Sequence, residues 1–359
     1  MVDSKNYFKK HLLKWNRVFN KREMPWKGEK DPYKIWLSEI ILQQTRVDQG
    51  LNYYHRFIEE FPGIHQLAQA PEERVFKLWE GLGYYTRCKN LIATAKNISQ
   101  NLNGHFPVNY DAILALKGIG PYTAAAISSF AFNLPYAVVD GNVFRVLARY
   151  FAIATPIDST EGKRQFTDLA HELLDKNLPG EYNQALMDFG ATICKPQIPL
   201  CSDCPLKKNC KAYLSQSVSE YPVKEKTITK KSRWLYYVVA EYKGSVFVRK
   251  RGAKDIWENL YEFLLSEQEE AITAEKVLPD FFSKNGSSLE VYSIDHISAV
   301  YKQQLTHQTI CGQFIKIQLC RPVSFTGYEK VKINHLAELP FPKFITNYLK
   351  DKSVSLNLF

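Results

Sequence analysis

The sequence lacks a long uninterrupted apolar run, which argues against a membrane-spanning protein. An apolar stretch from Ala124 to Val139 is broken by Asn133 and Pro135. The first 19 residues are charged and amphipathic, and they contain no signal-peptide core. Internal repeats and low-complexity tracts are also missing. With hydrophobic residues at 45%, the chain should fold. We also expect a monomer in the cytoplasm, with no membrane contact.

The sequence also lacks the cysteine pattern of a disulfide framework. It has seven cysteines, an odd number, and Cys88, Cys311 and Cys320 are scattered along the chain. A reducing compartment fits this usage better than an oxidising one.

Acidic residues are in deficit. The formal net charge is +10, and it is uneven: residues 1–232 carry 31 Lys and Arg against 23 Asp and Glu, whereas residues 233–359 carry 16 against 14. A basic balance suits a polyanionic partner. A phosphate-binding surface is therefore expected in the N-terminal part.

A chain of 359 residues is suited to two domains. Apolar spacing predicts an all-α domain over residues 1–215, and the polar, Lys-rich residues 216–232 read as a linker. Residues 233–359 contain strand signals, among them a Lys243-Gly244 hairpin turn and alternation over Phe314–Leu319. The expected fold is multidomain, an all-α part followed by an α+β part.

The most specific pattern is a C-x6-C-x2-C-x5-C set of four cysteines, at residues 194–210: Cys194, Cys201, Cys204 and Cys210. Four thiolates at this spacing can enclose a metal centre. Structural zinc more often uses two short C-x2-4-C pairs, and only one is present here. The spacing leaves zinc and an iron–sulfur cluster open, and free thiols without metal remain a third reading.

A glycine-containing hairpin is expected between two apolar helical stretches, within residues 113–130. Gly118 and Gly120 permit a tight turn, and the next helix is expected to begin at Thr123. Backbone N–H groups at such a turn can hold a DNA phosphate without reading base sequence. The alternative is an ordinary helical hairpin.

Two acidic residues stand out as candidates for catalysis. Asp140 follows an apolar run and precedes a helix, so it is an N-cap candidate whose carboxylate should stay ionised. Glu39 sits in an apolar helical run beside Trp36 and Leu42, so its pKa should be raised. The alternative for Glu39 is an exposed helix stripe. A protonated Glu with an ionised Asp is the pair that cleaves a glycosidic bond.

Together these features resemble the helix-hairpin-helix DNA glycosylases of the endonuclease III superfamily, and specifically the MutY-type adenine DNA glycosylases. The resemblance is strong over residues 5–215 and weak beyond them. It is carried by the cysteine spacing, the hairpin, Val139–Gly141 and four further segments: Trp36–Glu39, Leu42–Val47, Gly81–Tyr85 and Tyr182–Gly190.

The resemblance implies a [4Fe–4S] cluster on the four cysteines, and duplex DNA with A·8-oxoguanine or A·G mispairs as partner. It assigns Glu39 to protonate the adenine, and Asp140 to stabilise the sugar cation or to form a covalent adduct. Tyr122 and Asn142 are placed beside the sugar. Lyase members of the superfamily carry a lysine where this chain has Tyr122, so a monofunctional glycosylase is expected.

Further residues are implied by the same resemblance. Gln44 and Tyr84 enter the base stack, and Arg22 and Gln184 line the base pocket. Gly118, Gly120 and Thr123 form the phosphate site. The C-terminal part resembles a Nudix-like lesion-recognition domain, in which Thr306 and His307 face 8-oxoguanine. It lacks the glutamate-rich box of a working Nudix hydrolase, so no nucleotide hydrolysis is expected.

Two other functions remain open from the sequence. One is an endonuclease III-like pyrimidine-lesion glycosylase with lyase activity, against which Tyr122 argues. The other is a non-catalytic iron–sulfur DNA-binding protein, which would be indifferent to Glu39.

Overall fold

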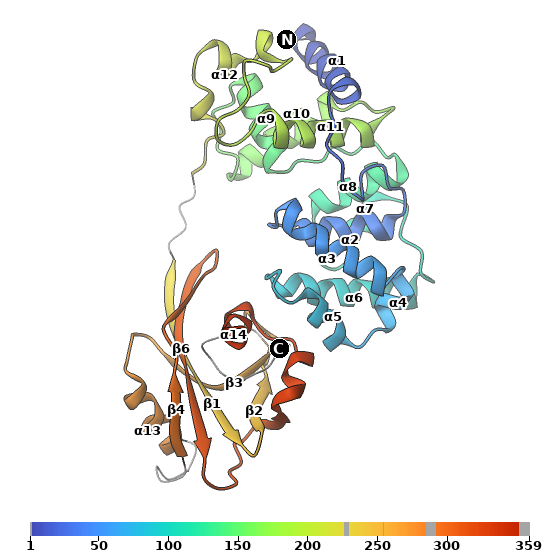
Figure 1. Ribbon diagram of the computed structural model, residues 1–359. Coiled ribbons are helices and arrows are strands. Elements are labelled where there is room, and N and C mark those ends of the chain that lie inside the picture. The colour runs from blue at the N-terminus through green and yellow to red at the C-terminus, as the bar shows by residue number, and fades with distance from the viewer. Residues whose placement is uncertain (1, 226–229, 254, 285–291, 352–359) are drawn as a thin grey trace. The chain divides into compact units, whose positions relative to one another are not determined.

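The contacts of the chain divide it into two compact units. The computed structural model describes residues 2–225, 230–253, 255–284 and 292–351 (Figure 1). One unit comprises Met1–Gln69 and Ala93–Thr227, and the other Ala70–Ile92 and Ile228–Phe359. No helix in the described parts is long and apolar enough to cross a membrane.

The first unit is helical. Its helices are α1 (Val2–Val18), α2 (Pro32–Leu42), α3 (Val47–Glu60), α4 (Ile64–Gln69), α7 (Tyr110–Leu114), α8 (Pro121–Phe132), α9 (Gly141–Phe151), α10 (Thr160–Leu173), α11 (Pro179–Thr192) and α12 (Lys211–Leu214). Short 3-10 turns cover Lys207–Asn209 and Val218–Glu220. Helix α6 (Tyr85–Asn101) begins in the second unit and ends in this one.

Helix starts in this unit follow their capping residues. Ser159 is the N-cap of α10 and accepts a hydrogen bond from Gly162 N at 2.9 Å. Helix α8 begins at Pro121, two residues before the predicted Thr123. Proline suits the first helical position because its φ is already helical and no N–H donor is needed there.

The largest core of the helical unit joins α1, α9, α10 and α11. Buried aromatic and aliphatic side chains from all four helices form it, including Phe8, Leu147, Phe166 and Phe189. Burying side chains of this size contributes about 1.5–3 kcal/mol each. This core holds the start of α9 against the last turn of α11, and both helices contribute to the site described below.

Part of the expected linker is attached to the helical unit. Ile157 N donates to Val223 O at 3.0 Å, and Arg149 Nε donates to the carbonyl oxygens of Val218 and Tyr221. These bonds hold the segment directly after α12 on the surface of the helices.

The second unit is built on a mixed sheet. Its strands are β1 (Lys231–Tyr242), β2 (Ser245–Lys250), β3 (Tyr261–Gln268), β4 (Tyr292–Ile297), β5 (Tyr301–Gln304), β6 (Gln308–Leu319) and β7 (Glu329–Lys332). Its helices are α5 (Glu72–Trp79), α13 (Ala274–Lys284) and α14 (Lys343–Leu349), with a 3-10 turn at Ile333–Glu338. The strand order is β4-β6-β1-β3-β2-β7, with β5 paired to β6.

Two predictions about this sheet are confirmed. Lys243 and Gly244 both have positive φ, +49° and +70°, and join β1 to the antiparallel β2 as the expected two-residue turn. Within β6, Ile315, Ile317 and Leu319 are buried while Gln318 is exposed. Strands β1 and β6 are parallel, so the sheet is mixed.

Helices cover both faces of the sheet (Figure 1). On one face Val277 and Phe282 of α13 pack with Tyr236 and Val238 of β1. On the other face Tyr348 of α14 stacks on Phe314, with ring centroids 4.0 Å apart. Successive side chains of a strand therefore pack into hydrophobic cores on opposite faces of the sheet.

The segment Ala70–Ile92 belongs to this unit through polar contacts. Lys77 Nζ donates to Leu339 O at 2.9 Å, and Phe341 N donates to Glu80 Oε1 at 2.9 Å. The Tyr261 hydroxyl bonds Glu73 at 3.0 Å.

Strand pairing predicts the effect of one substitution, Gly312→Ala. A Cβ at Gly312 would lie 1.8 Å from Leu235 O of the paired strand, so β1 and β6 would have to separate. We expect a loss of about 1–3 kcal/mol in the free energy of unfolding, measured by urea titration of the full chain. Gly252→Ala is the matched control, because a Cβ there meets nothing within 4 Å. Equal midpoints for the two variants would contradict the expectation.

Candidate active site

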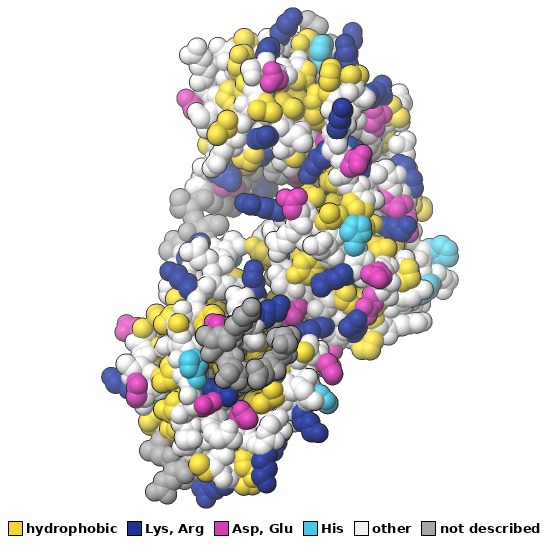
Figure 2. Space-filling model, viewed as in Figure 1, with side chains coloured by type: hydrophobic (Ala, Val, Ile, Leu, Met, Phe, Trp, Pro, Cys, Tyr) yellow, Lys and Arg dark blue, Asp and Glu magenta, His cyan; other side chains and the backbone are white. Residues whose placement is uncertain are grey.

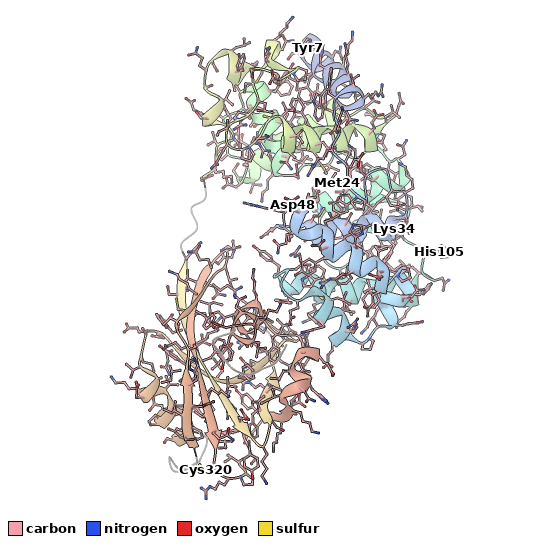
Figure 3. The ribbon with its side chains drawn as sticks, viewed as in Figure 1. Tyr7, Met24, Lys34, Asp48, His105 and Cys320 are labelled. Atoms are coloured by element: carbon pink, nitrogen blue, oxygen red, sulfur yellow. The ribbon has the colours of Figure 1, made fainter. Side chains whose placement is uncertain are left out.

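A polar pocket opens in the helical unit between α2, α8, α9 and α11. It has a volume of about 720 Å³, part of it open to solvent. Its lining includes six residues singled out from the sequence: Arg22, Glu39, Tyr122, Asp140, Asn142 and Gln184. Met24, labelled in Figure 3, joins them from the segment between α1 and α2.

Glu39 is buried at the wall of this pocket. Helix α2 is apolar all round, and Asp31 caps it by accepting from Tyr33 N. The helix is therefore buried and carries Glu39 inward, leaving the side chain 5% exposed. Burial raises the pKa of Glu39 to about 7, while a hydrogen bond with Tyr122 opposes the rise and the nearby Asp140 adds to it. The raised pKa expected from the sequence is confirmed.

Asp140 is the N-cap of α9. Its Oδ1 accepts from Val143 N at 2.8 Å and its Oδ2 from Asn142 Nδ2 at 2.7 Å. Burial raises the pKa of Asp140 above its ordinary range, and these hydrogen bonds oppose the rise. The sequence predicted the cap correctly. It missed the burial, which depends on the packing of α9 against other elements.

Tyr122 stands at the start of α8, where the hydroxyl reaches Glu39. Burial raises the pKa of the Tyr122 phenol well above its ordinary value, and the neighbouring Glu39 and Asp140 carboxyls raise it further. Tyr122 is therefore a neutral hydrogen-bond donor at this position. No lysine lines the pocket among the residues the structure describes.

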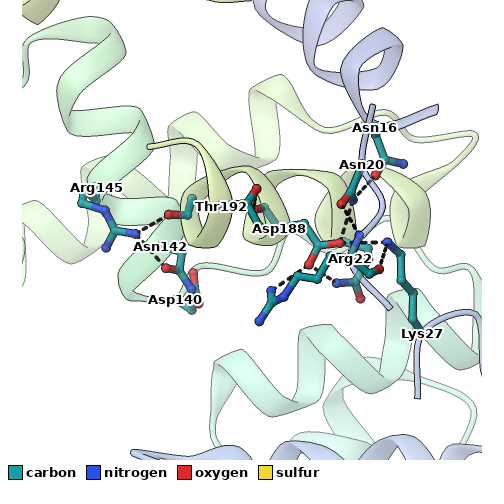
Figure 4. Close-up of polar contacts among 11 residues, drawn as sticks. Asn16, Asn20, Arg22, Lys27, Asp140, Asn142, Arg145, Asp188 and Thr192 are labelled. Carbon is teal, nitrogen blue, oxygen red and sulfur yellow. Dashed lines mark hydrogen bonds and ion pairs between the residues drawn. The ribbon is translucent and has the colours of Figure 1, made fainter. Parts of the chain in front are cut away.

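Arg145 links this site to the cysteine loop, and sequence reasoning missed it. Its guanidinium donates to Asn142 Oδ1 at 2.8 Å (Figure 4). It also donates to Gly190 O at 2.7 Å and to Cys194 O at 2.8 Å. Asn142 in turn donates to Asp140. The signal available in sequence was only an arginine one turn into an apolar helix.

The glycine hairpin joins α7 to α8 as expected. Gly118 has φ +78°, a conformation that glycine adopts without strain. Gly120 is the N-cap of α8 and has open space around it. Thr123 is buried, and its hydroxyl accepts from Gln43 Nε2 at 3.3 Å. The exposed backbone of the turn, rather than the Thr123 side chain, is thus available to a ligand.

The four cysteines line one cavity of about 320 Å³, part of it open to solvent. Their thiols are unpaired. Arg149 closes one side, with Nη1 3.5 Å from Cys194 Sγ and bonds to Lys195 O and Pro196 O. In the described parts of the chain no three His, Cys, Asp or Glu side chains are grouped to hold one metal ion. The four thiols therefore line a cavity and are not gathered tightly around a single ion position in the described residues.

Gln44 and Tyr84 share an unusual backbone conformation. Both have positive φ, +56° and +50°, and both are exposed. Such conformations cost about 1–3 kcal/mol outside glycine and gather at functional sites. Tyr85, by contrast, is buried.

Thr306 and His307 form the tip of the β5–β6 hairpin, closed by a bond from Leu305 N to Gln308 O. Within the second unit, the Tyr84 hydroxyl lies 2.5 Å from Thr306 Oγ1. The structure therefore brings together two residues that the sequence singled out separately.

Arg22 and Gln184 meet at a buried acid that the sequence analysis did not select. Asp188 has no exposed side-chain surface and binds Arg22 Nη1 at 2.8 Å and Gln184 Nε2 at 3.0 Å (Figure 4). The available signal was the one that identified Glu39, namely one acid within an apolar helix.

Basic side chains are spread over the face of the molecule seen in Figure 2 and do not gather in one patch.

Two family models match the chain. Residues 37–172 match the HhH-GPD superfamily of base excision DNA repair proteins, and residues 235–351 match the NUDIX domain. The helical unit and the mixed-sheet unit thus each have a family counterpart.

Curated relatives cover most of the chain. The adenine DNA glycosylase of Buchnera aphidicola subsp. Baizongia pistaciae is 37% identical over 309 residues, which span 84% of this chain and 84% of that protein. The adenine DNA glycosylase of Mus musculus is 42% identical over 215 residues, 57% of this chain and 42% of that protein.

Solved structures share the helical fold. A thermostable thymine-DNA glycosylase matches with a TM-score of 0.55 and 29% identity, over 59% of this chain and 98% of that one. Endonuclease III in a non-covalent DNA complex matches with a TM-score of 0.51 and 21% identity, over 59% of this chain and 97% of that one. The second match shows the fold alone.

The raised pKa of Glu39 predicts a pH-dependent stability. Because the folded protein favours the protonated acid, wild type loses stability relative to Glu39→Gln as the pH rises from the ordinary 4.5 to about 7. The total loss is about 3 kcal/mol, and the difference is constant at higher pH. Urea unfolding at several pH values measures it, with Glu59→Gln on the exposed side of α3 as control. A difference that does not change with pH would contradict the expectation.

Proposed function

Because the chain belongs to the adenine DNA glycosylase family, we propose that it excises adenine mispaired with 8-oxoguanine or guanine from double-stranded DNA. The observation that carries the proposal is the pairing of Glu39, with its pKa raised to about 7, and Asp140 in one pocket. Two carboxyl groups held in different environments are suited to acid-assisted cleavage of a glycosidic bond.

Glu39 is the proposed acid. Near neutral pH an appreciable fraction of its carboxyl groups holds a proton, which passes to a ring nitrogen of the adenine as the N-glycosidic bond breaks. Protonation makes the departing adenine neutral, and the electron pair of the broken bond leaves with it. The Tyr122 hydroxyl, bonded to Glu39, orients the carboxyl group.

Asp140 is the proposed partner of the sugar. Bond cleavage leaves an oxocarbenium-like deoxyribose, which an ionised carboxylate beside it stabilises. Asn142 and the Val143 N–H hold the Asp140 carboxylate in place. Water then adds to the sugar, and an abasic site remains.

Contacts with DNA are proposed for several exposed groups. The N–H groups of the Gly118–Gly120 turn and the N-terminus of α8 are suited to one backbone phosphate. Gln44 and Tyr84 are exposed on strained backbone, and side chains of this kind can fill the space that a flipped base leaves. Arg22 and Gln184 line the pocket that would receive the base.

Thr306 and His307 are proposed to contact the opposing 8-oxoguanine. They lie at a hairpin tip, and the Thr306 hydroxyl is already within hydrogen-bond distance of Tyr84. One hydroxyl can thus serve both the inserted aromatic residue and the lesion.

The cysteine cavity fits a [4Fe–4S] cluster. Four thiols line one space, and no tight set for a single ion is found among the described residues. Cys194, Cys201, Cys204 and Cys210 would hold the cluster, which would supply a rigid, charged core for the loop. Lys195, Lys207 and Lys208 belong to that loop and are suited to DNA phosphates.

Base release tests the proposal directly. Duplex DNA with an A·8-oxoguanine pair should break at the adenine only after alkali treatment, because the abasic product is alkali-labile. Glu39→Gln should slow release by about 10²–10⁴-fold, whereas Glu59→Gln should not. No break after alkali with the wild-type protein would overturn the proposal. Binding without base release would favour a non-catalytic DNA-binding protein.

The same reaction tests the lyase alternative. Tyr122 supplies no amine to form a Schiff base, so borohydride should trap little protein on DNA. Trapping at the level of a true lyase would favour the endonuclease III-like function instead.

Cluster content can be measured by absorbance. Purified protein should be brown, with an absorbance band at about 400–420 nm from iron–thiolate charge transfer. Cys204→Ser should lose the band. Cys320→Ser should keep it, because Cys320 is exposed and lies outside the cavity lining. A colourless protein containing one zinc ion per chain would contradict the cluster.

A further inference from the structure

The loop between α5 and α6, residues 80–84, has an unusual backbone. Gly81, Gly83 and Tyr84 all have positive φ, at +94°, +75° and +50°. A residue other than glycine keeps such a conformation only where the surrounding structure holds it. The Tyr84 side chain is nevertheless 45% exposed. The position of this exposed ring therefore depends on what holds the two ends of the loop.

Side chains from the flanking helices hold the loop from within. Trp79 is buried at the end of α5, and its Nε1 donates to Gly83 O at 3.0 Å. The Arg87 guanidinium lies over the rings of Trp79 and Tyr84, 5.3 Å from each ring centroid. Such cation–π contacts are attractive. They fix the Tyr84 ring relative to the end of α5 and the start of α6.

The first anchor of the loop is Glu80, directly after α5. Its Oε1 accepts from Phe341 N at 2.9 Å, and its Oε2 accepts from Lys77 Nζ at 3.0 Å. Lys77 Nζ also donates to Leu339 O at 2.9 Å. The Glu80 and Lys77 side chains are only 16% and 24% exposed. Charge-assisted hydrogen bonds shielded in this way are stronger than surface ion pairs. The end of α5 is thus tied to the segment that leads into α14.

The second anchor is Lys89, one turn into α6. It forms an ion pair with Glu258, which belongs to the turn before β3. This pair is more exposed than the first anchor, at 44% for Lys89 and 24% for Glu258. The two anchors stand on opposite sides of Tyr84 in the sequence. The mixed-sheet unit therefore holds the loop at both of its ends.

We propose that Glu80 and Lys89 are positioning residues, through which the mixed sheet and the segment before α14 hold Tyr84 ready to enter the base stack, whichever base it meets there. The inference rests on the proposed function, in which Tyr84 fills the space that a flipped base leaves. It gives the mixed-sheet unit a second task, separate from the contact that Thr306 and His307 make with the lesion.

The two tasks differ in their dependence on the opposing base. A contact at the hairpin tip depends on groups that 8-oxoguanine has and guanine lacks. The anchors act through the backbone of the loop, and a loop ordered in advance lowers the cost of insertion by the same amount beside either base. A weakened anchor should therefore slow the release of adenine from both mispairs by the same factor.

Glu80→Ala tests the first anchor. Single-turnover release of adenine is measured from duplexes with an A·8-oxoguanine or an A·G pair. Both rates should fall by about tenfold, and their ratio should stay at the wild-type value. Glu80→Gln keeps an oxygen that can accept from Phe341 N but loses the ion pair with Lys77. Its rates should lie between those of wild type and Glu80→Ala.

Glu73→Ala is the matched control. Glu73 lies in the first turn of α5 and contacts the Tyr261 hydroxyl and Lys250 Nζ. The substitution removes contacts between α5 and the same sheet, but it does so at the far end of the helix from the loop. Both rates should stay at the wild-type values.

A charge swap tests the second anchor. Lys89→Glu and Glu258→Lys each place like charges side by side, so each should slow release from both mispairs. Combining the two substitutions restores an ion pair with the opposite direction, and the rates should recover. If Glu80→Ala does not fold by circular dichroism, this set of variants decides the question.

Insertion itself can be followed with a fluorescent base. 2-Aminopurine placed beside 8-oxoguanine emits more strongly when its stacking is disturbed. Glu39→Gln is the background for this measurement, because it keeps the adenine attached. Binding should raise the emission. Adding Glu80→Ala should reduce that rise at saturating protein, whereas adding Glu73→Ala should preserve it.

Four results would overturn the inference. They are unchanged rates in Glu80→Ala, a loss confined to the 8-oxoguanine duplex, an equal loss in Glu73→Ala, and a charge swap that restores nothing. In each case the wild-type protein still releases adenine, so the proposed function stands. A protein that raises the emission but releases no adenine as wild type would overturn the proposed reaction alone. A protein that does neither would overturn both.

Discussion

Two carboxyl groups in one partly buried pocket impose the main constraint on the helical unit. Burial raises the pKa of both Glu39 and Asp140, and the nearby Asp140 raises the pKa of Glu39 further. Two such carboxyl groups can act differently only when their surroundings favour the protonated form of one and the ionised form of the other. Glu39 lies on a helix that is apolar all round, whereas Asp140 receives N–H donors at the start of α9. The two carboxyl groups therefore have different electrostatic environments although their side chains are similar.

The packing of the helical unit maintains the different environments of Glu39 and Asp140. The shared core of α1, α9, α10 and α11 fixes where α9 begins. Arg145 then connects Asn142 to the carbonyl oxygens of Gly190 and Cys194. The position of the Asp140 carboxylate thus depends on the end of α11 and on the start of the cysteine loop. A change in that loop would therefore alter the pocket through the hydrogen bonds that Arg145 makes to these carbonyl oxygens and to Asn142.

A second buried acid, Asp188, binds two side chains that line the pocket, Arg22 and Gln184. Asp188 ties the segment between α1 and α2 to α11 through Arg22 and Asn20. Glu39 and Asp188 are buried and Asp140 is half-buried, and the three carboxyl groups have different partners. Glu39 has the Tyr122 hydroxyl, Asp140 has N–H groups at a helix start, and Asp188 has two cationic side chains. The partners, more than the depth of burial, decide what each carboxyl group can do.

The sequence by itself determined the local elements and the residue types. Capping chemistry located the start of α9, the Lys243-Gly244 pair located the β1–β2 turn, and an acid in an apolar run identified Glu39. These signals are local, because a cap or a tight turn is decided by residues a few positions apart. Only the tertiary structure decided which distant groups meet. Asp188 with Arg22, Arg145 with Cys194, and Tyr84 with Thr306 are contacts over long sequence separations. They depend on how helices and hairpins pack, and no short pattern encodes that.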